Sequence, residues 1–266
     1  MATGRMQYFS PALNQITEFS FVLPNDLQPH ERAGNPCYDR PSKTLYLLHG
    51  LTGIDTDWLW GGGCARELAR DYNLNIFMPT CGNNYYIDRP GRGNEYGRFI
   101  GEEFPDYVSE LFGLSPYRAD TLIGGFSMGG YGTLQAAFTY PDAFSGAIAL
   151  SAANPTVSAD PEGRDNPIDR YEAEFYRSVF GPPEGLGDSE KNPEVRAAAA
   201  VAAGKKLPRL YLACGTEDTL IWINRRYRDR LSPLASDLRY EEGPGRHDWQ
   251  FWNHYVRRGL DDLLNE

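Results

Sequence analysis

Residues 120–134 read Asp-Thr-Leu-Ile-Gly-Gly-Phe-Ser-Met-Gly-Gly-Tyr-Gly-Thr-Leu, and this stretch decides the fold. An apolar run over 121–123 precedes the pentapeptide Gly-Phe-Ser-Met-Gly at 125–129, and a helix-like run from 131 to 140 follows it. The order predicts a strand, a sharp turn that carries Ser127, and a helix. Gly125 and Gly129 remove the side chains that would collide where the strand and the helix close on each other.

A serine on a strand-to-helix turn with the pattern G-x-S-x-G is typical of the nucleophile elbow of α/β-hydrolases. The helix begins beneath the serine, so its N-terminal dipole favours negative charge there. The pentapeptide alone is a weak signal, because a chain with 28 glycines can match it by chance. Its flanking strand and helix strengthen it, and we predict that Ser127 is a nucleophile.

The rest of the chain alternates strands with helices, which predicts an α/β fold: a mostly parallel central sheet with helices on both faces. A length of 266 residues suits a single α/β-hydrolase domain over 1–266. From 154 to about 206 the periodicity weakens, and we predict an insertion there that forms a lid. The expected strands are 16–23, 44–48, 74–78, 121–123, 146–150, 207–214 and 238–241, and the expected helices are 57–72, 98–112, 131–140, 220–234 and 249–264.

Histidine is the usual base for a serine nucleophile, and in this fold it follows the serine and the acid along the chain. Of the four histidines, His30 and His49 precede Ser127. His247 lies in the loop between the last strand and the last helix, whereas His254 lies inside that helix. We therefore predict His247 as the base and His254 as a helix-surface residue.

The acid is expected after the penultimate strand, where the chain reads Gly-Thr-Glu-Asp at 215–218. Asp218 is the prediction and Glu217 is the local alternative. A buried aspartate would hold the imidazole in the right tautomer and stabilise the imidazolium as it forms. Asp248, next to His247, is predicted to cap the last helix instead.

Two backbone N–H groups are expected to bind the oxyanion of the tetrahedral intermediate. One belongs to Met128, after the nucleophile, and the other to Leu51, in the loop after the strand 44–48. In that loop His49 is interpreted as a packed structural residue. Four further side chains near the same sheet edge either bind substrate or pack the loops, and both interpretations stay open: Trp58, Asn83, Tyr85 and Tyr86.

The charge and composition of the chain restrict the kinds of molecule that we expect it to bind. The formal net charge of −10 argues against nucleic acid, whose phosphates need clustered Lys and Arg. No apolar run reaches the roughly 18 residues of a membrane span, and residues 1–10 hold no apolar segment of a secretory signal. The four cysteines have no metal-site spacing. We therefore expect no membrane partner, no metal and a cytoplasmic location.

Several ordered motifs resemble the esterase D family of α/β-hydrolases, which includes S-formylglutathione hydrolases, tributyrin esterases, feruloyl and acetylxylan esterases, and mycolyltransferases. The likeness runs from about residue 44 to the C-terminus and is weak over the insertion. The tyrosine pair at 85–86 and Glu-Glu-Phe-Pro at 102–105 are most similar to the tributyrin-esterase type. The other matching segments are 45–50, 57–58, 125–132, 215–218 and 247–252.

The resemblance implies a serine carboxylesterase that hydrolyses short-chain acyl esters, with Ser127, Asp218 and His247 as its triad and Leu51 and Met128 as oxyanion donors. It implies a small-molecule ester substrate and no metal or organic cofactor. Some members form dimers or larger assemblies, so a homo-oligomer stays open. The alternatives are an S-formylglutathione hydrolase, a feruloyl or acetylxylan esterase, an acyltransferase to an alcohol or sugar, and a binding protein on the same fold.

Overall fold

The computed structural model describes residues 1–157 and 170–264. Within these ranges the chain forms one eight-stranded sheet in the order β1-β2-β4-β3-β5-β6-β7-β8. The neighbours from β4 to β8 are parallel, whereas β2 is antiparallel to both β1 and β4. The predicted mostly parallel sheet is confirmed. The strands are β1 Ala2–Ser10, β2 Gln15–Leu23, β3 Lys43–Leu48, β4 Leu74–Pro79, β5 Thr121–Phe126, β6 Gly146–Leu150, β7 Arg209–Gly215 and β8 Leu238–Gly243.

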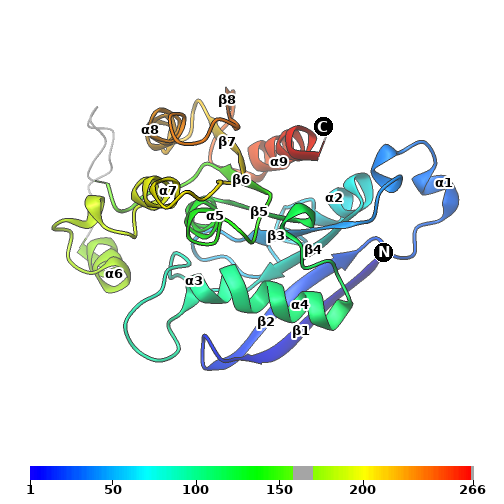
Figure 1. Cartoon of the computed structure of the whole chain (residues 1–266), viewed down its shortest axis with the longest axis horizontal. Coiled ribbons are helices and arrows are strands. Elements are labelled where there is room, and N and C mark those ends of the chain that lie inside the picture. Colours follow the sequence, from blue (N-terminus) through cyan, green and yellow to red (C-terminus); the bar gives the residue numbers. More distant parts are fainter. Residues whose placement is uncertain (158–169, 265–266) are drawn as a thin grey trace.

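Helices cover both faces of the sheet (Figure 1). One face carries α4 Phe104–Phe112, α5 Met128–Thr139, α7 Pro193–Ala202 and α8 Ile221–Leu231, and the other carries α2 Ala65–Tyr72 and α9 Trp249–Leu264. None of the described helices is long and apolar enough to cross a lipid bilayer. The remaining elements are α1 Pro29–Arg32, α3 Tyr96–Arg98, α6 Arg170–Phe180, the π-helical turn η2 Phe99–Glu103, and the 3-10 turns η1 Pro36–Tyr38, η3 Arg118–Asp120 and η4 Leu186–Asp188.

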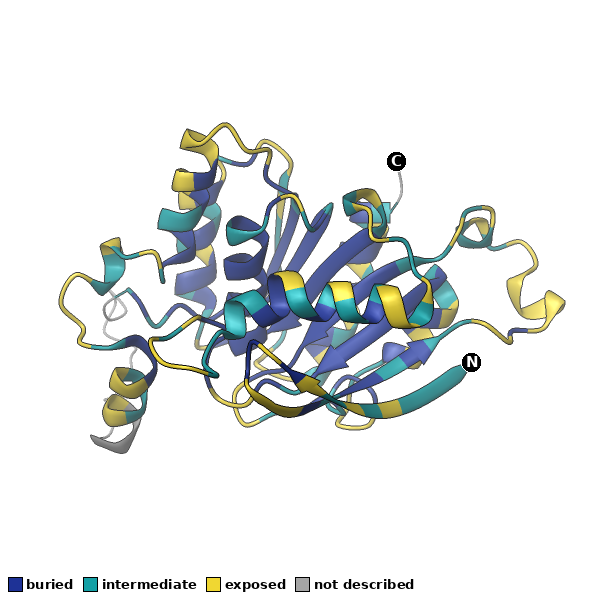
Figure 2. Ribbon diagram, turned by 60° about the horizontal axis from the view of Figure 1, so that its bottom comes forward, coloured by how far each residue is buried: buried dark blue, intermediate teal, exposed yellow. Residues whose placement is uncertain are grey.

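The central strands are buried on both faces (Figure 2). Because successive side chains of a strand point to opposite faces, Tyr46 and Leu48 of β3 join the core under α5, and Leu45 and Leu47 join the core under α9. Burial on both sides explains the continuous apolar runs that predicted these strands. The sheet therefore separates two apolar layers.

The carboxyl ends of β3, β5, β6, β7 and β8 lie along one edge of the sheet, because these strands run parallel and pair in register. The loops that begin there are 49–53, the turn at 127, 151–154, 215–218 and 244–248. In a parallel sheet this is the edge where ligands bind. The fold thus brings the predicted site residues to one side of the molecule.

The N-terminal strand β1 was not predicted from the sequence. Its exposed side chains include Arg5, Gln7 and Phe9, so its apolar signal is weak. It forms because every residue from Ala2 to Ser10 pairs with β2 in an antiparallel hairpin. This edge strand therefore forms because its backbone pairs with β2, and not because it buries an apolar face.

The helix expected over 57–72 is shorter than predicted. Residues 56–63 form tight turns closed by backbone hydrogen bonds, and α2 begins only at Ala65. Gly61 and Gly63 lie so close to the backbone of Asp57 and Trp58 that a Cβ would collide with it. Three consecutive glycines therefore end the turns before the helix starts.

The expected insertion at 154–206 includes two described helices, and residues 158–169 lie outside the described part of the chain. α7 packs against α5 and α8 with Ala197 and Ala200 buried, so it belongs to the helical layer on that face. α6 lies at one end of the molecule, beside the loop that follows β4 (Figure 1). The part of the insertion that contains α6 packs on the loop after β4, and a lid over the sheet edge stays a prediction.

Candidate active site

Ser127 occupies the predicted turn between β5 and α5. Its backbone has φ 56° and ψ −119°, a strained conformation for a residue with a side chain. The Ser127 N–H donates to Leu150 O at 2.9 Å, and the Ser127 carbonyl accepts from Tyr131 N and Ala153 N, each at 3.1 Å. These bonds hold the serine at the N-terminus of α5.

The glycines of the pentapeptide allow this turn. A Cβ on Gly125 would lie 2.6 Å from Gly129 O, and a Cβ on Gly129 would lie 2.5 Å from Leu48 O. Real Cβ atoms do not approach backbone oxygens so closely, so only glycine fits at either position. The close approach brings the first turn of α5 directly against the end of β3.

Asp218 and His247 are brought together from different loops. His247 Nδ1 lies 2.8 Å from Asp218 Oδ2, and because a carboxylate only accepts, the Nδ1–H donates. This bond leaves Nε2 available as an acceptor. Among the described residues no hydrogen bond links the Ser127 hydroxyl to His247, and such bonds in unliganded enzymes often form only when substrate binds.

The side chain of Asp218 is fully buried, whereas that of His247 is one-third exposed. Burial raises the pKa of the Asp218 carboxyl, but the hydrogen bond and charge of His247 and the Leu220 N–H at 2.8 Å outweigh burial. The pKa of Asp218 therefore lies below its usual value. An ionised Asp218 is suited to orient a histidine and to stabilise its positive charge.

Acid should weaken the fold through Asp218. Since its pKa is lower in the folded chain, its pairing stabilises the protein above the unfolded pKa of about 3.9 and is lost as pH falls through the folded pKa. We expect the unfolding free energy of the wild type to fall more steeply below about pH 4 than that of Asp218→Asn. Urea denaturation from pH 6 to pH 3 measures this, and identical pH dependences would contradict it.

Aromatic side chains pack against the ring of His247. The ring of Trp252 meets the His247 ring edge-on at 4.9 Å and stacks on Phe126 at 4.1 Å. Trp252 Nε1 donates to the hydroxyl of Ser151, a buried residue with φ 45° at the end of β6. No role was predicted for Ser151 or Trp252 from the sequence, although Trp252 lies in the matching segment 247–252 and Ser151 directly follows β6.

Among the described residues, neither the alternative acid Glu217 nor the alternative base His254 forms a hydrogen bond with this pair. Glu217 is exposed and forms an ion pair with Arg246 at 3.2 Å. His254 is exposed on α9, as predicted. The capping role of Asp248 is confirmed, because its Oδ1 accepts from Phe251 N at 3.0 Å in the first turn of α9.

The 49–53 loop after β3 and the first residue of α5 carry the two predicted oxyanion donors. Within the described residues neither Leu51 N–H nor Met128 N–H donates to a protein acceptor. The Met128 N–H is free because the first turn of a helix has no acceptor for it. Leu51 is 37% exposed, which places it at the surface of the site edge.

His49 is buried, in agreement with its interpretation as a structural residue. The backbone Cys81 N–H donates to Nε2 at 3.0 Å, so the ring proton is on Nδ1, which donates to Gly50 O at 2.8 Å. Burial lowers the pKa of His49. A neutral His49 thus ties the 49–53 loop to the 81–86 loop.

The four side chains proposed for substrate binding differ in exposure. Trp58 is 1% exposed and donates its Nε1–H to Leu48 O, and Tyr86 is 1% exposed and donates to His49 O at 2.8 Å. Tyr85 is also buried. Asn83 is exposed, and its Oδ1 accepts from Thr52 N at 2.7 Å. Burial favours a packing role for Trp58, Tyr85 and Tyr86, and substrate contact stays a prediction for all four residues.

A buried carboxylate anchors the segment after the 49–53 loop. Asp55 receives both Nε and Nη2 of Arg5 at 2.8 Å, the hydroxyl of Ser20 at 2.6 Å and that of Thr80 at 2.9 Å. These partners come from β1, β2 and the end of β4. The N-terminal hairpin, of which only β2 was predicted, therefore helps to fix the site edge.

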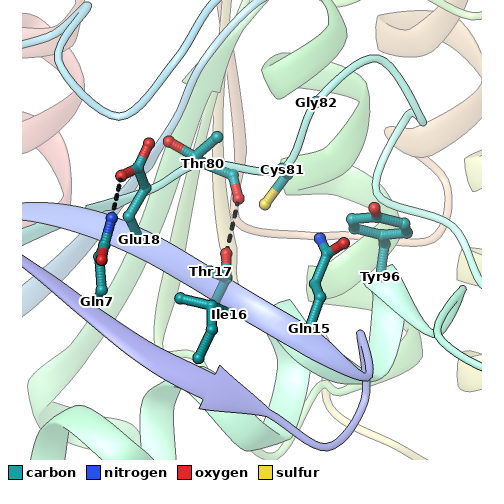
Figure 3. A pocket seen from close by; sticks show the side chains of 9 residues that line it. All are labelled: Gln7, Gln15, Ile16, Thr17, Glu18, Thr80, Cys81, Gly82 and Tyr96. Atoms are coloured by element: carbon teal, nitrogen blue, oxygen red, sulfur yellow. Dashed lines mark hydrogen bonds between the residues drawn. The ribbon is translucent and has the colours of Figure 1, made fainter.

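A cavity of about 380 Å³ lies beside the 81–86 loop, between β2 and the segment after β4 (Figure 3). Several of its polar groups are paired with one another, since Thr17 donates to Thr80 O at 3.4 Å and Gln7 donates to Glu18 at 3.2 Å. Neither Ser127 nor His247 lines it. We assign the reaction to the Ser127 edge and not to this cavity.

Comparison with known proteins finds esterases and serine hydrolases that match this chain over nearly its whole length. The sequence profile described as putative esterase matches residues 10–263. An acetyl esterase of Caldicellulosiruptor saccharolyticus is 34% identical over 98% of this chain and 97% of its own. The fluorophosphonate-binding serine hydrolase F of Staphylococcus aureus has a TM-score of 0.81 at 29% identity, over 100% of this chain and 99% of its own. The S-formylglutathione hydrolase of the same organism has a TM-score of 0.80 at 30% identity, over 99% of each chain.

Proposed function

The chain belongs to the putative esterase family, of the esterase D type, and is a carboxylic ester hydrolase with the α/β-hydrolase fold; from that premise we propose that it cleaves short-chain acyl esters through Ser127, His247 and Asp218. Acetyl esters are the first candidates, because the acetyl esterase relative covers nearly the whole chain. The observation that carries the proposal is the 2.8 Å bond between His247 and the buried Asp218, at the sheet edge where the strained Ser127 turn lies.

In the proposed reaction the Ser127 hydroxyl attacks the ester carbonyl while His247 Nε2 accepts its proton. The tetrahedral oxyanion accepts hydrogen bonds from Leu51 N–H and Met128 N–H. The C–O bond to the alcohol then breaks, His247 returns the proton to the leaving oxygen, and an acyl-serine remains. Water, deprotonated by His247, attacks the acyl-serine. The bond between the acyl group and the Ser127 oxygen then breaks, His247 returns the proton to that oxygen, and the acid is released.

The order of the loops supports this assignment. The 49–53 loop follows β3 and the elbow follows β5, and these two strands are direct neighbours. The Asp218 loop follows β7 and the His247 loop follows β8, which are also neighbours. A Cβ on Gly215 would lie 2.3 Å from Gly245 O, so the last two loops are in contact. Acid and base are thus held as a unit.

Hydrolysis of S-formylglutathione is the second candidate, favoured by the 30% identity to the staphylococcal hydrolase. The thioester would be cleaved by the same steps, with a thiol as the leaving group. The two candidate substrates differ in the leaving group, which is an alcohol in one and a thiol in the other. Measuring the rate of hydrolysis of each substrate distinguishes them.

A hydrolysis panel on the wild type tests the proposal. It contains p-nitrophenyl esters from acetate to octanoate, acetylated xylan, methyl ferulate and S-formylglutathione, each with and without added alcohol or sugar acceptors. We expect kcat/KM to be highest from acetate to butyrate, with free acid as the product. A higher kcat/KM on S-formylglutathione or ferulate than on the short-chain esters would contradict the proposed substrate class. Acyl transfer to the added acceptor would contradict the proposed hydrolysis.

A further inference from the structure

The 81–86 loop contacts the 49–53 loop at three points. Cys81 N–H donates to His49 Nε2 at 3.0 Å, the Tyr86 hydroxyl donates to His49 O at 2.8 Å, and Thr52 N–H donates to Asn83 Oδ1 at 2.7 Å. The three bonds fall on both sides of Leu51 in the chain. They fix the backbone that presents the Leu51 N–H.

Tyr86 also contacts α5, the helix whose first residue, Met128, carries the other oxyanion donor. Its ring packs so closely on α5 that a Cβ at Gly132 would lie 2.2 Å from Tyr86 Cδ2. A Cβ at Gly129 would lie 2.7 Å from His49 O, the atom that accepts the Tyr86 hydroxyl. Tyr86 therefore lies between the first turns of α5 and the 49–53 loop, and its contacts set the distance between them.

The backbone of this segment is strained. Tyr85 and Tyr86 have φ values of 57° and 55°, and two consecutive bulky residues in the left-handed region are uncommon. Each costs free energy that the surrounding contacts must offset, and such strain concentrates at functional sites. The conformation lets the two neighbouring side chains reach different partners.

Tyr85 contacts both α6 and α5, where its ring centre lies 5.4 Å from that of Tyr131. Its hydroxyl lies 3.2 Å from the Tyr176 hydroxyl, and its ring centre lies 5.0 Å from that of Phe180 and 6.5 Å from that of Phe175. The adjacent Tyr86 contacts His49. One peptide bond thus links the lid-like helix to the loop that holds Leu51.

We propose that Tyr86 is a positioning residue that sets the spacing of the two oxyanion donors, and that Tyr85 makes this spacing depend on the docking of α6. The inference rests on the proposed function, since it assumes that Leu51 and Met128 bind the oxyanion. Tyr86 acts through His49 and α5 and does not touch the substrate. When α6 is docked, the Tyr85–Tyr86 segment holds the donors at the distance that the tetrahedral intermediate requires.

The variant Tyr86→Phe removes only the hydroxyl. We expect kcat on p-nitrophenyl acetate to fall about three- to tenfold, the range that corresponds to one neutral hydrogen bond, while KM stays within about twofold. The Ki of a trifluoromethyl ketone, which forms a tetrahedral adduct, should rise by the same factor as kcat/KM falls. A purely structural role would lower the melting temperature without this correlation.

Tyr72→Phe is the matched control. The Tyr72 hydroxyl is also hydrogen-bonded, with Asp261 Oδ1 at 2.8 Å and Arg257 O at 3.2 Å as its acceptors, but Tyr72 lies just before the start of β4, at the opposite edge of the sheet. Its kcat should equal that of the wild type. Unchanged kcat and Ki in folded Tyr86→Phe would overturn the proposal, even if Ser127 proves essential.

The α6 link is tested by a double-mutant cycle of Tyr176→Phe, which removes the α6 hydroxyl that lies 3.2 Å from that of Tyr85, and Tyr86→Phe. Because both changes act through one segment, the decrease in kcat of the double variant should be smaller than the product of the single decreases. Circular dichroism and titration with a fluorophosphonate confirm that each variant is folded and reactive. If the kcat of the double variant fell by the full product of the two single decreases, the link to α6 would be overturned.

Discussion

Ser127→Ala should lower kcat for p-nitrophenyl acetate by about 10⁵- to 10⁶-fold, because it removes the atom that forms the acyl-enzyme. The turn itself should survive, since the backbone bonds of Ser127 to Leu150, Tyr131 and Ala153 do not involve the hydroxyl. We therefore expect the same melting temperature within a few degrees. Steady-state hydrolysis and thermal unfolding of the purified variant measure both quantities.

Ser232→Ala is the control for this change. Ser232 is exposed, and its hydroxyl donates to Arg228 O at 2.6 Å at the end of α8. Its removal should leave kcat unaltered. If Ser127→Ala kept more than about one-hundredth of the wild-type rate, an acyl-serine mechanism at this position would be excluded.

Asp218→Asn should lower kcat by about 10⁴-fold with little change in KM, because it imposes the wrong histidine tautomer. The Asp218 Oδ1 accepts from Leu220 N at 2.8 Å, so an asparagine would keep its oxygen there and turn its amide NH₂ toward His247. His247 Nδ1 would then have to accept, and the ring proton would move to Nε2. A protonated Nε2 cannot take the proton of Ser127.

Glu217→Gln is the matched control, because Glu217 is the adjacent carboxylate and pairs only at the surface with Arg246 at 3.2 Å. It should change kcat less than about twofold, as expected for an exposed ion pair. Equal losses in the two variants would point to a general effect of charge. A larger loss in Glu217→Gln would make Glu217 the acid.

The strands that carry the site were predictable, because their apolar runs reflect burial on both faces. β3 and β6 match the expected ranges to within one residue. The positions of Ser127, Asp218 and His247 at the ends of strands follow from the same pattern. The pairing of Asp218 with His247 was predicted from the order of residues, and the 2.8 Å bond agrees with it.

The remaining features depend on contacts between segments far apart in the chain. β1 exists through pairing with β2, and the fixed position of Asp55 requires Arg5 from that strand. The left-handed backbone of Tyr85 and Tyr86 leaves no local signal, since tyrosine is not favoured there. Tertiary packing decides these conformations.

The most direct test of the account is to find which residue forms the covalent intermediate. The wild type is treated with a fluorophosphonate, digested, and mapped by tandem mass spectrometry, with loss of esterase activity followed in parallel. We predict one adduct, on Ser127, whose formation matches the loss of activity and is abolished in Ser127→Ala. An adduct on another residue such as Ser151, or full inactivation without modification of Ser127, would contradict the proposed mechanism.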